Sequence, residues 1–277
     1  MSLAIGLQSM LFVPGSKPER FAKALASGAD CVCIDLEDAV PPEGKVAARD
    51  AAFAAIAADT TGRLTLRINA LTTPEGAADI AALAAAKLTP PLLFVPKVEG
   101  ANELGQARTV LGIGQYAFVP LIETVKGLRE IDQIAASSRV KALMFGGADF
   151  AAEIGAELSW EPLYAARAAL VMAGALAGIP VIDVPSINLD DPDGLTLETQ
   201  RIKAMGFAAK AAIHPAQIAT IHAVMRPTPA QIAEAEAAET AFAAANGAAV
   251  RFNGKMLEAP IMRRYRQILM LKDKIHA

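Results

Sequence analysis

The chain lacks the features that mark membrane, secreted and nucleic-acid-binding proteins. Although 53% of its residues are hydrophobic, no run of about 18 apolar residues is free of polar ones, so no transmembrane helix is expected. The first residues, MSLAIGLQSMLF, lack the basic segment and cleavage site of a secretory signal, so the expected compartment is the cytoplasm. Lysine and arginine are scattered and the net charge is −3, which indicates no nucleic-acid partner.

Cysteine is scarce as well. The only two, Cys31 and Cys33, stand two residues apart in the strand-like run DCVCID, which places both side chains on one face of a sheet. A C-x-C pair without a second cluster is a poor metal motif, and cytosolic thiols usually stay reduced. Both side chains are therefore expected in the core.

Several catalytic and nucleotide-binding motifs are also missing. No G-x-G-x-x-G follows an apolar run and no G-x-x-x-x-G-K-[ST] occurs, which disfavours the usual nucleotide sites of open sheets. The G-x-S-x-G of a Ser-His-Asp hydrolase is absent too. His214 is one of only three histidines, and its place beside a proline favours a structural role.

What the chain does contain is a regular alternation of apolar runs and alanine-rich helical stretches. At 277 residues it is close to the roughly 250 residues of a (β/α)8 barrel. We predict an α/β chain with a TIM barrel at residues 1–226 and a C-terminal helical extension at 227–277, and an open doubly wound sheet is the competing fold. The predicted strands are Ser9–Val13, Cys31–Leu36, Leu64–Ile68, Leu92–Val95, Ala117–Ile122, Val140–Phe145, Val181–Val184 and Ala209–Ile213.

The stretch from Ala117 to Phe150 carries the most informative pair of acids. Two of the predicted strands lead to Glu123 and Asp149, and one predicted helix, Val125–Ala136, joins them. Parallel strands bring both carboxylates to the same rim, where two hard oxygen ligands suit Mg²⁺. The alternative is that both acids only cap a helix or a turn.

The extension has a clear pattern of its own. Thr228 is placed to cap a long helix, Ala230–Ala245, which stops before a strand-like Ala249–Phe252. A last helix is expected from Ile261 to about Lys274. The pattern is typical of a lid or of an element that docks on a neighbouring subunit.

Taken together, eight stretches resemble the citrate lyase β-subunit-like branch of the malyl-CoA lyase and HpcH/HpaI aldolase superfamily. The resemblance implies a (β/α)8 barrel, Mg²⁺ dependence and reversible carbon–carbon cleavage of a coenzyme A thioester to a 2-keto acid and an acyl-CoA. It also implies a homotrimer or larger oligomer in which the C-terminal segment reaches an adjacent active site. The matching stretches are MLFVPGSKPERFAKAL, ADCVCIDLEDAV, RIN, FVPKVE, IETVKG, FGGADFAAEIG, AAIHPAQI and NGKMLEAP.

By that resemblance Glu123 and Asp149 are the metal ligands, and Glu123 also borders the substrate. Arg67 would hold the keto-acid carboxylate, since its planar fork matches that group; an ion pair with Glu37 or Asp38 is the alternative. Glu37 and Asp38 correspond to an acidic pair that orients Arg67 and metal-bound water.

The remaining contacts implied by the resemblance come from two loops. The backbone amides of Gly146, Gly147 and Ala148 would face the same carboxylate. Lys17 and Arg20, with Lys23 after them, would meet coenzyme A phosphates, and a solvated surface is the alternative.

Two positions depart from the family's pattern. Glu258 stands where the family has an aspartate, the general acid that a neighbouring subunit supplies to protonate the released enolate. The extra methylene changes its reach, and a shift of about 1 Å can cost on the order of 10²-fold in rate. The alternative for Glu258 is an ordinary acid before the helix after Pro260. Gln8 stands where members often have arginine.

Other functions remain open at this point. Lys97, at a strand end, is a candidate for the lysine of a Schiff-base aldolase. Such a lysine needs a depressed pKa, and the nearby Glu99 argues against that shift. The same Mg²⁺ and coenzyme A contacts would serve a thioester hydrolase, or a β subunit acting on an acyl carrier with other citrate lyase subunits. A sensor that binds keto acid or coenzyme A without turnover is the non-enzyme alternative. Malyl-CoA, citramalyl-CoA and citryl-CoA are the candidate substrates, and differences on the scale of a methylene are worth only about 1–3 kcal/mol.

Overall fold

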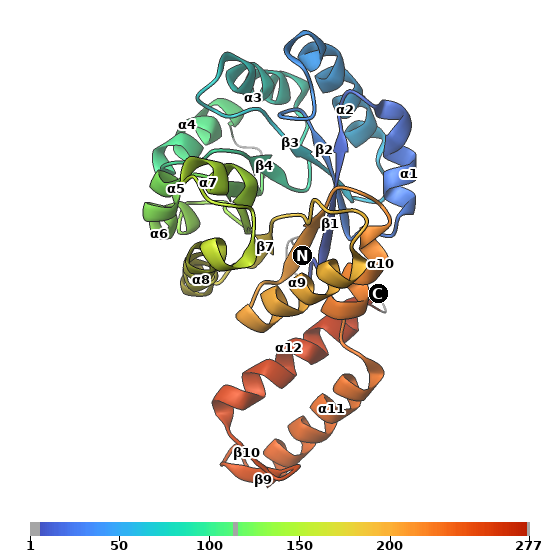
Figure 1. Cartoon of the computed structure of the whole chain (residues 1–277), viewed down its shortest axis with the longest axis vertical. Helices are drawn as coiled ribbons and strands as arrows, with labels where there is room; N and C mark the ends of the chain where they lie inside the picture. The colour runs from blue at the N-terminus through green and yellow to red at the C-terminus, as the bar shows by residue number, and fades with distance from the viewer. Residues whose placement is uncertain (1–5, 113–115, 276–277) are drawn as a thin grey trace. The chain divides into compact units, whose positions relative to one another are not determined.

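The computed structural model describes residues 6–112 and 116–275 (Figure 1). The chain forms two compact units that divide between Ala223 and Val224, three residues before the predicted division. Among the described residues, no helix has the length and apolar character needed to cross a membrane.

Eight parallel strands close into a barrel in sequence order, and β1 pairs with both β2 and β8. The prediction of a (β/α)8 barrel is confirmed. Seven of these strands both begin and end within one residue of their predicted bounds. The strands are β1 (Ser9–Pro14), β2 (Cys31–Asp35), β3 (Leu64–Arg67), β4 (Leu93–Val95), β5 (Phe118–Ile122), β6 (Leu143–Phe145), β7 (Val181–Asp183) and β8 (Ala209–Ala212).

A continuous core runs through these strands, as expected when both faces of a parallel sheet are covered. It includes Phe94, Val119 and Met144, together with Cys31 and Cys33, which are fully buried. Burial raises the pKa of both thiols, so these cysteines are inert packing groups, as predicted.

Helices cover the outside of the barrel (Figure 1). Short 3-10 turns at Pro18–Arg20 and Pro42–Gly44 precede α1 and α2. The helices are α1 (Phe21–Ala26), α2 (Lys45–Ala58), α3 (Pro74–Ala86), α4 (Ala101–Leu111), α5 (Val125–Arg129), α6 (Ile131–Ala135), α7 (Gly147–Glu153), α8 (Trp160–Ala177), α9 (Pro192–Met205) and α10 (Gln217–Met225).

The prediction was wrong in three places around the barrel. The helix predicted from Val125 to Ala136 is two helices, because Glu130 leaves the helical conformation. The strand predicted from Val140 is shorter, since Val140 makes only an isolated bridge to Phe118. Helix α7 was not predicted, because a segment that opens with two glycines has the composition of a loop.

The second unit has its own small core. It contains α11 (Pro229–Ala244), an antiparallel hairpin of β9 (Val250–Phe252) and β10 (Lys255–Leu257), and α12 (Ala259–Ile275). Thr228 caps α11 in a capping box with Gln231, as its sequence predicted. The core brings together Ala238, Phe242, Leu257 and Met262. Strand β10 was not predicted, and α12 begins two residues earlier than expected.

Candidate active site at the carboxyl ends of the strands

Arg67, the last residue of β3, is the centre of a cluster of acids. Its Nε and Nη2 atoms donate to the two carboxylate oxygens of Asp35, both at 2.7 Å. Its Nη1 atom lies 3.0 Å from Glu37 and 3.6 Å from Asp38, and its guanidinium carbon lies 4.8 Å from the centre of the Phe12 ring. Burial opposes the charge, but the hydrogen bond and charge of Asp35 and the charge of Glu37 raise the pKa of Arg67.

Asp35 is a residue to which the sequence assigned no role. It is 1% exposed and, besides Arg67, accepts hydrogen bonds from the amides of Glu37 (2.9 Å) and Ala39 (3.1 Å). One carboxylate therefore holds both the guanidinium and the loop that carries the other acids. Its position as the first acid of the DLED stretch, at a strand end, is the signal that could have identified it.

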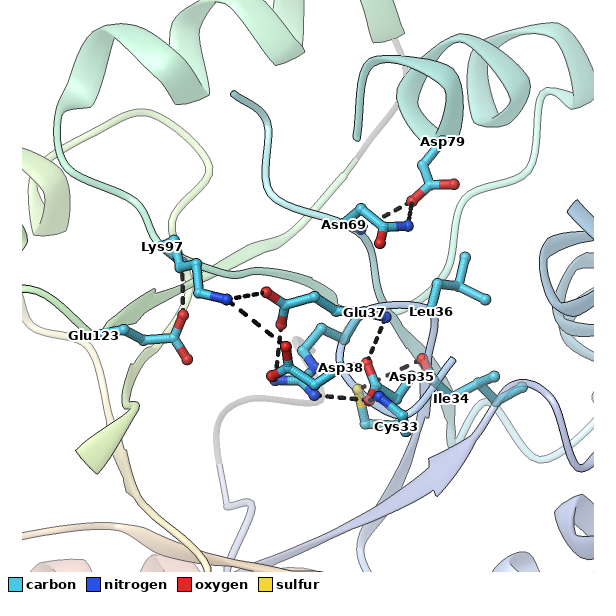
Figure 2. Close-up of polar contacts among 12 residues, drawn as sticks. Cys33, Ile34, Asp35, Leu36, Glu37, Asp38, Asn69, Asp79, Lys97 and Glu123 are labelled. Carbon is cyan, nitrogen blue, oxygen red and sulfur yellow. Dashed lines mark hydrogen bonds and ion pairs between the residues drawn. The ribbon is translucent and has the colours of Figure 1, made fainter. Parts of the chain in front are cut away.

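Lys97 follows β4 and contacts three acids (Figure 2). Its Nζ atom lies 2.8 Å from Glu37 and 3.7 Å from Asp38, while its backbone amide donates to Oε2 of Glu123 at 2.8 Å. The backbone of Lys97 is left-handed, with φ 53°. Burial opposes the charge, but the hydrogen bond and charge of Glu37 raise the pKa of Lys97. A Schiff-base lysine needs the opposite shift.

Glu123 follows β5 and is 2% exposed. Burial, with the neighbouring charges of Glu37 and Asp149, raises the pKa of Glu123 to about 8 even though Arg67 acts against the shift. Thr124, not Glu123, caps α5, because its hydroxyl accepts the amide hydrogen of Gly127. Glu123 is thus free of the capping role that its sequence position allowed.

The double glycine before Asp149 shapes the space around Glu123. A Cβ on Gly146 would lie 2.1 Å from Cγ of Glu123, so only glycine fits. The Gly146 amide already donates to the carbonyl of Ile122 at 3.0 Å, which leaves Gly147 and Ala148 as the amides to propose for a substrate carboxylate. Asp149 lies exposed in the first turn of α7.

A second hydrogen-bond network, which sequence reasoning also missed, holds the loop after β2 in place. Lys45 of α2 donates to the carbonyls of Leu36 (2.8 Å) and Glu37 (2.7 Å) and to the side-chain oxygen of Asn69 (2.6 Å). Asn69 in turn donates to the buried Asp79 through both its backbone and its side chain (Figure 2). Lys45 and Asp79 lie inside helices, where a charged residue gives no sign that it faces a site.

The other predicted residues lie apart from this cluster. Lys17, Arg20 and Lys23 are exposed in the connection after β1 and in α1. His214 is exposed in a turn where its ring accepts the amide hydrogen of Ala216. Glu258 is exposed in the second unit, between β10 and α12.

The charges of the cluster do not balance, and this fits a divalent cation. The two cations Arg67 and Lys97 face five carboxylates: Asp35, Glu37, Asp38, Glu123 and Asp149. Among the described residues, no three His, Cys, Asp or Glu side chains form a metal-ligating group. A pair of carboxylates is nevertheless the usual protein contribution to Mg²⁺, which keeps several waters.

Several known proteins are similar to this chain in sequence and fold. The model of the family described as HpcH/HpaI aldolase/citrate lyase matches residues 8–215. Two proteins of Cereibacter sphaeroides are each 32% identical: an L-malyl-CoA/beta-methylmalyl-CoA lyase, with 96% of this chain and 95% of the relative covered, and a (3S)-malyl-CoA thioesterase, with 98% and 96% covered. The structure of protein CitE from Mycobacterium tuberculosis in complex with magnesium, acetoacetate and coenzyme A is 30% identical. Its TM-score is 0.81, and 96% of this chain and 98% of that chain are covered.

Proposed function

The chain belongs to the HpcH/HpaI aldolase/citrate lyase family and is a carbon–carbon lyase of that kind, and from this premise we propose that it cleaves a coenzyme A thioester of a 2-hydroxy acid. The products are a 2-keto acid and an acyl-CoA of the acetyl-CoA type, and Mg²⁺ is the cofactor. The observation that carries the proposal is the excess of carboxylates over cations in the cluster that contains Arg67 and the buried Glu123.

Arg67 is proposed to bind the carboxylate of the keto acid. Asp35 occupies its Nε and Nη2 atoms, so the Nη1 end, which lies 3.0 Å from Glu37 and 3.6 Å from Asp38, is the part of the fork proposed to meet the substrate. Arg67 thereby orients the substrate, and Asp35 fixes the rotamer of Arg67 before binding. The amides of Gly147 and Ala148 are proposed as further donors to the same carboxylate.

Glu123 and Asp149 are the residues proposed to hold Mg²⁺, which when bound acts as a Lewis acid on the oxygen at the cleaved carbon. Glu37 lies between Arg67 and Lys97, where it keeps both cations in place. A carboxylate of the cluster takes the hydroxyl proton of the substrate, and the freed electron pair forms the carbonyl of the keto acid. The carbon–carbon bond breaks, and its electron pair leaves with the thioester enolate, which then takes up a proton.

The proton donor is proposed to be Glu258, from the second unit of a neighbouring copy in a homotrimer or larger oligomer. Its exposed carboxyl between β10 and α12 is accessible for this role, and Lys17 and Arg20 are proposed to meet coenzyme A phosphates. Subunit mixing tests the shared site. Glu123→Gln and Glu258→Gln are each expected to be inactive, whereas mixed oligomers regain turnover at sites that receive neither substitution. No recovery in verified mixed oligomers contradicts a site shared between subunits.

The reaction itself is tested with purified protein, Mg²⁺ and malyl-CoA, citramalyl-CoA and citryl-CoA in separate assays. Release of keto acid without free thiol is the expected result, and Glu123→Ala is the inactive control. If no substrate yields keto acid while Mg²⁺ still binds, the lyase proposal fails for these three thioesters, and a binding role without turnover takes its place.

A thioester hydrolase is the second candidate, because one of the two relatives at 32% identity is a (3S)-malyl-CoA thioesterase. Both reactions use the same thioester, so identity at this level does not separate them. Free thiol released without keto acid would favour the hydrolase, and release of both would indicate cleavage followed by hydrolysis. Activity only after addition of an acyl carrier protein would place the chain inside a multi-subunit citrate lyase.

A further inference from the structure

A second cavity lies beside β7, apart from the cluster around Arg67. Its volume is about 360 Å³, and its walls are the connection before α8, the loop after β7 and the first turns of α9. Small-molecule sites typically measure about 300–1,000 Å³, so the space is large enough for a small ligand. None of the residues proposed for the lyase reaction lines it.

Arg167 of α8 is one of the residues that line this cavity. The residue is 1% exposed; its Nε atom donates to Asp183 at 2.8 Å and its Nη2 atom to Glu198 at 3.1 Å. Its Nη1 atom is buried and has no hydrogen-bond partner in the described part of the chain. A buried donor without an acceptor is costly, and this nitrogen has almost no accessible surface, so Arg167 contributes positive charge behind the wall of the cavity.

Arg201 of α9 adds a second guanidinium to the same wall. Its guanidinium carbon lies 5.2 Å from the ring centre of Trp160, and that of Arg167 lies 4.9 Å from the same centre. Within residues 6–112 and 116–275, Arg201 makes no ion pair, whereas Asp183 and Glu198 are both paired with Arg167 and Lys210.

The third acid near the cavity is balanced in another way. The Asp191 carboxylate accepts the amide hydrogen of Gly194 at 2.8 Å and caps the start of α9, where the helix dipole favours negative charge. Arg201 is therefore the cation of the cavity whose charge no described acid balances.

Part of the lining of the cavity is apolar. Ile187 is 63% exposed and Leu197 is 50% exposed, and Val184 and Pro185 line the space beside them. We propose that the cavity binds a small organic carboxylate with a short branched apolar tail. The carboxylate pairs with the guanidinium of Arg201 beside Trp160, since guanidinium forks match carboxylate geometry, and the tail covers Ile187 and Leu197.

The cavity adjoins the candidate active site through one contact, and the two sites need separate tests. Val184 lies so close to Gly147, the first residue of α7, that a Cβ added there would meet its Cγ1 atom at 3.2 Å. Keto acid at the site around Glu123 requires Mg²⁺ under the proposed function. Binding in the second cavity requires no metal, so chelation of metal distinguishes the sites.

Trp160 is the only tryptophan of the chain, so its fluorescence reports on this cavity. The experiment titrates the full-length protein with 3-methylbutanoate in excess EDTA. The expected result is a saturable change in Trp160 fluorescence, about tenfold weaker binding to Arg201→Gln and unchanged binding to Arg108→Gln, an exposed arginine on α4. Ile187→Ser should weaken 3-methylbutanoate more than acetate.

Four results would overturn the proposal. They are the absence of a saturable change, equal affinity for 3-methylbutanamide, equal affinity in Arg201→Gln, and a change that appears only with Mg²⁺. Inorganic phosphate binding as tightly as 3-methylbutanoate, with no effect of Ile187→Ser, would replace the proposed ligand with a simple anion. Every readout is independent of turnover, so failure here leaves the lyase proposal untouched.

Discussion

Two ionic clusters at the carboxyl ends of the strands differ in how their charges balance. Around Arg67, five carboxylates face two cations, and the side chains of Lys97 and Asp38 are 38% and 58% exposed. Around Arg167, two carboxylates face two cations, and only Glu198, at 26%, is more than slightly exposed. The charges around Arg167 balance within the described residues, whereas those around Arg67 leave a negative excess that a cation would offset. The difference in net charge, more than the number of ion pairs, distinguishes the two clusters.

The largest expected effect is on stability and comes from the balanced cluster. Arg167→Met removes the partner of Asp183 and Glu198 and leaves buried charge uncompensated. It should lower the free energy of unfolding by about 3–5 kcal/mol, measured by urea denaturation. Arg108→Met, at an exposed position, should change it by less than about 0.5 kcal/mol. A loss of under about 1 kcal/mol in Arg167→Met would show that the cluster is not a structural support.

In the unbalanced cluster the expected effect falls on activity instead. Glu123→Gln keeps the size of the side chain but removes a negative charge, so Mg²⁺ affinity and turnover should fall by at least on the order of 10²-fold. Stability should hold or rise, because burial and neighbouring acids already disfavour the charge and raise the pKa of Glu123 to about 8. Calorimetric titration with Mg²⁺ and denaturation measure the two quantities. Unchanged Mg²⁺ affinity would remove Glu123 from the metal site.

A pair of glycine substitutions tests whether the side chain of Glu123 packs so closely against the backbone after β6 that only glycine fits there. A Cβ on Gly146 would meet the side chain of Glu123, whereas a Cβ on Gly105, inside α4, meets nothing within 4 Å. Gly146→Ala should cost about 1–3 kcal/mol and lower turnover, because Glu123 must move. Gly105→Ala should stabilise by about 0.5–1 kcal/mol with turnover unchanged. Equal turnover in both variants would contradict the close approach.

The smallest effect is expected at the amino-terminal ends of the strands. The Asp30 carboxylate accepts the amide hydrogens of Gln8 and Ser9, both at 2.9 Å, and lies 3.5 Å from His222. Burial acts to raise the pKa of Asp30, but the hydrogen bonds and the charge of His222 outweigh it, so the pKa lies below the ordinary 3.8.

A depressed pKa means that the ionised Asp30 stabilises the folded state above that ordinary value, and that this stability is lost as the pH falls through the folded-state pKa. Asp30→Asn should therefore cost about 1 kcal/mol near pH 6, and the difference from the wild type should fade below about pH 3. Denaturation at several pH values measures it. A difference that stays constant down to pH 2 would contradict the pKa shift.

Sequence reasoning was strongest for the candidate site residues at the carboxyl ends of the strands. Arg67 lies at the end of a predicted strand, and Glu123 and Asp149 follow predicted strands, so the topology alone brings them to one rim, and the structure places them within one charge cluster. It was weakest for residues inside helices. Lys45 in α2 and Arg167 in α8 contact residues near the strand ends. The partners in each pair are far apart in the sequence, so no local pattern predicts the contact.

The sequence by itself determined the barrel, the capped helix of the second unit and the strand-end acids, because hydrophobic period, caps and strand direction are local or topological properties. Only the tertiary structure decided which charges pair. It showed that Asp35 occupies two nitrogens of Arg67 and that the Gly146 amide is already used by the sheet. It also showed that Arg167 keeps one nitrogen without a partner among the described residues. The physical reason is that charge balance and hydrogen-bond satisfaction depend on distances between segments far apart in the chain, which the order of residues does not specify.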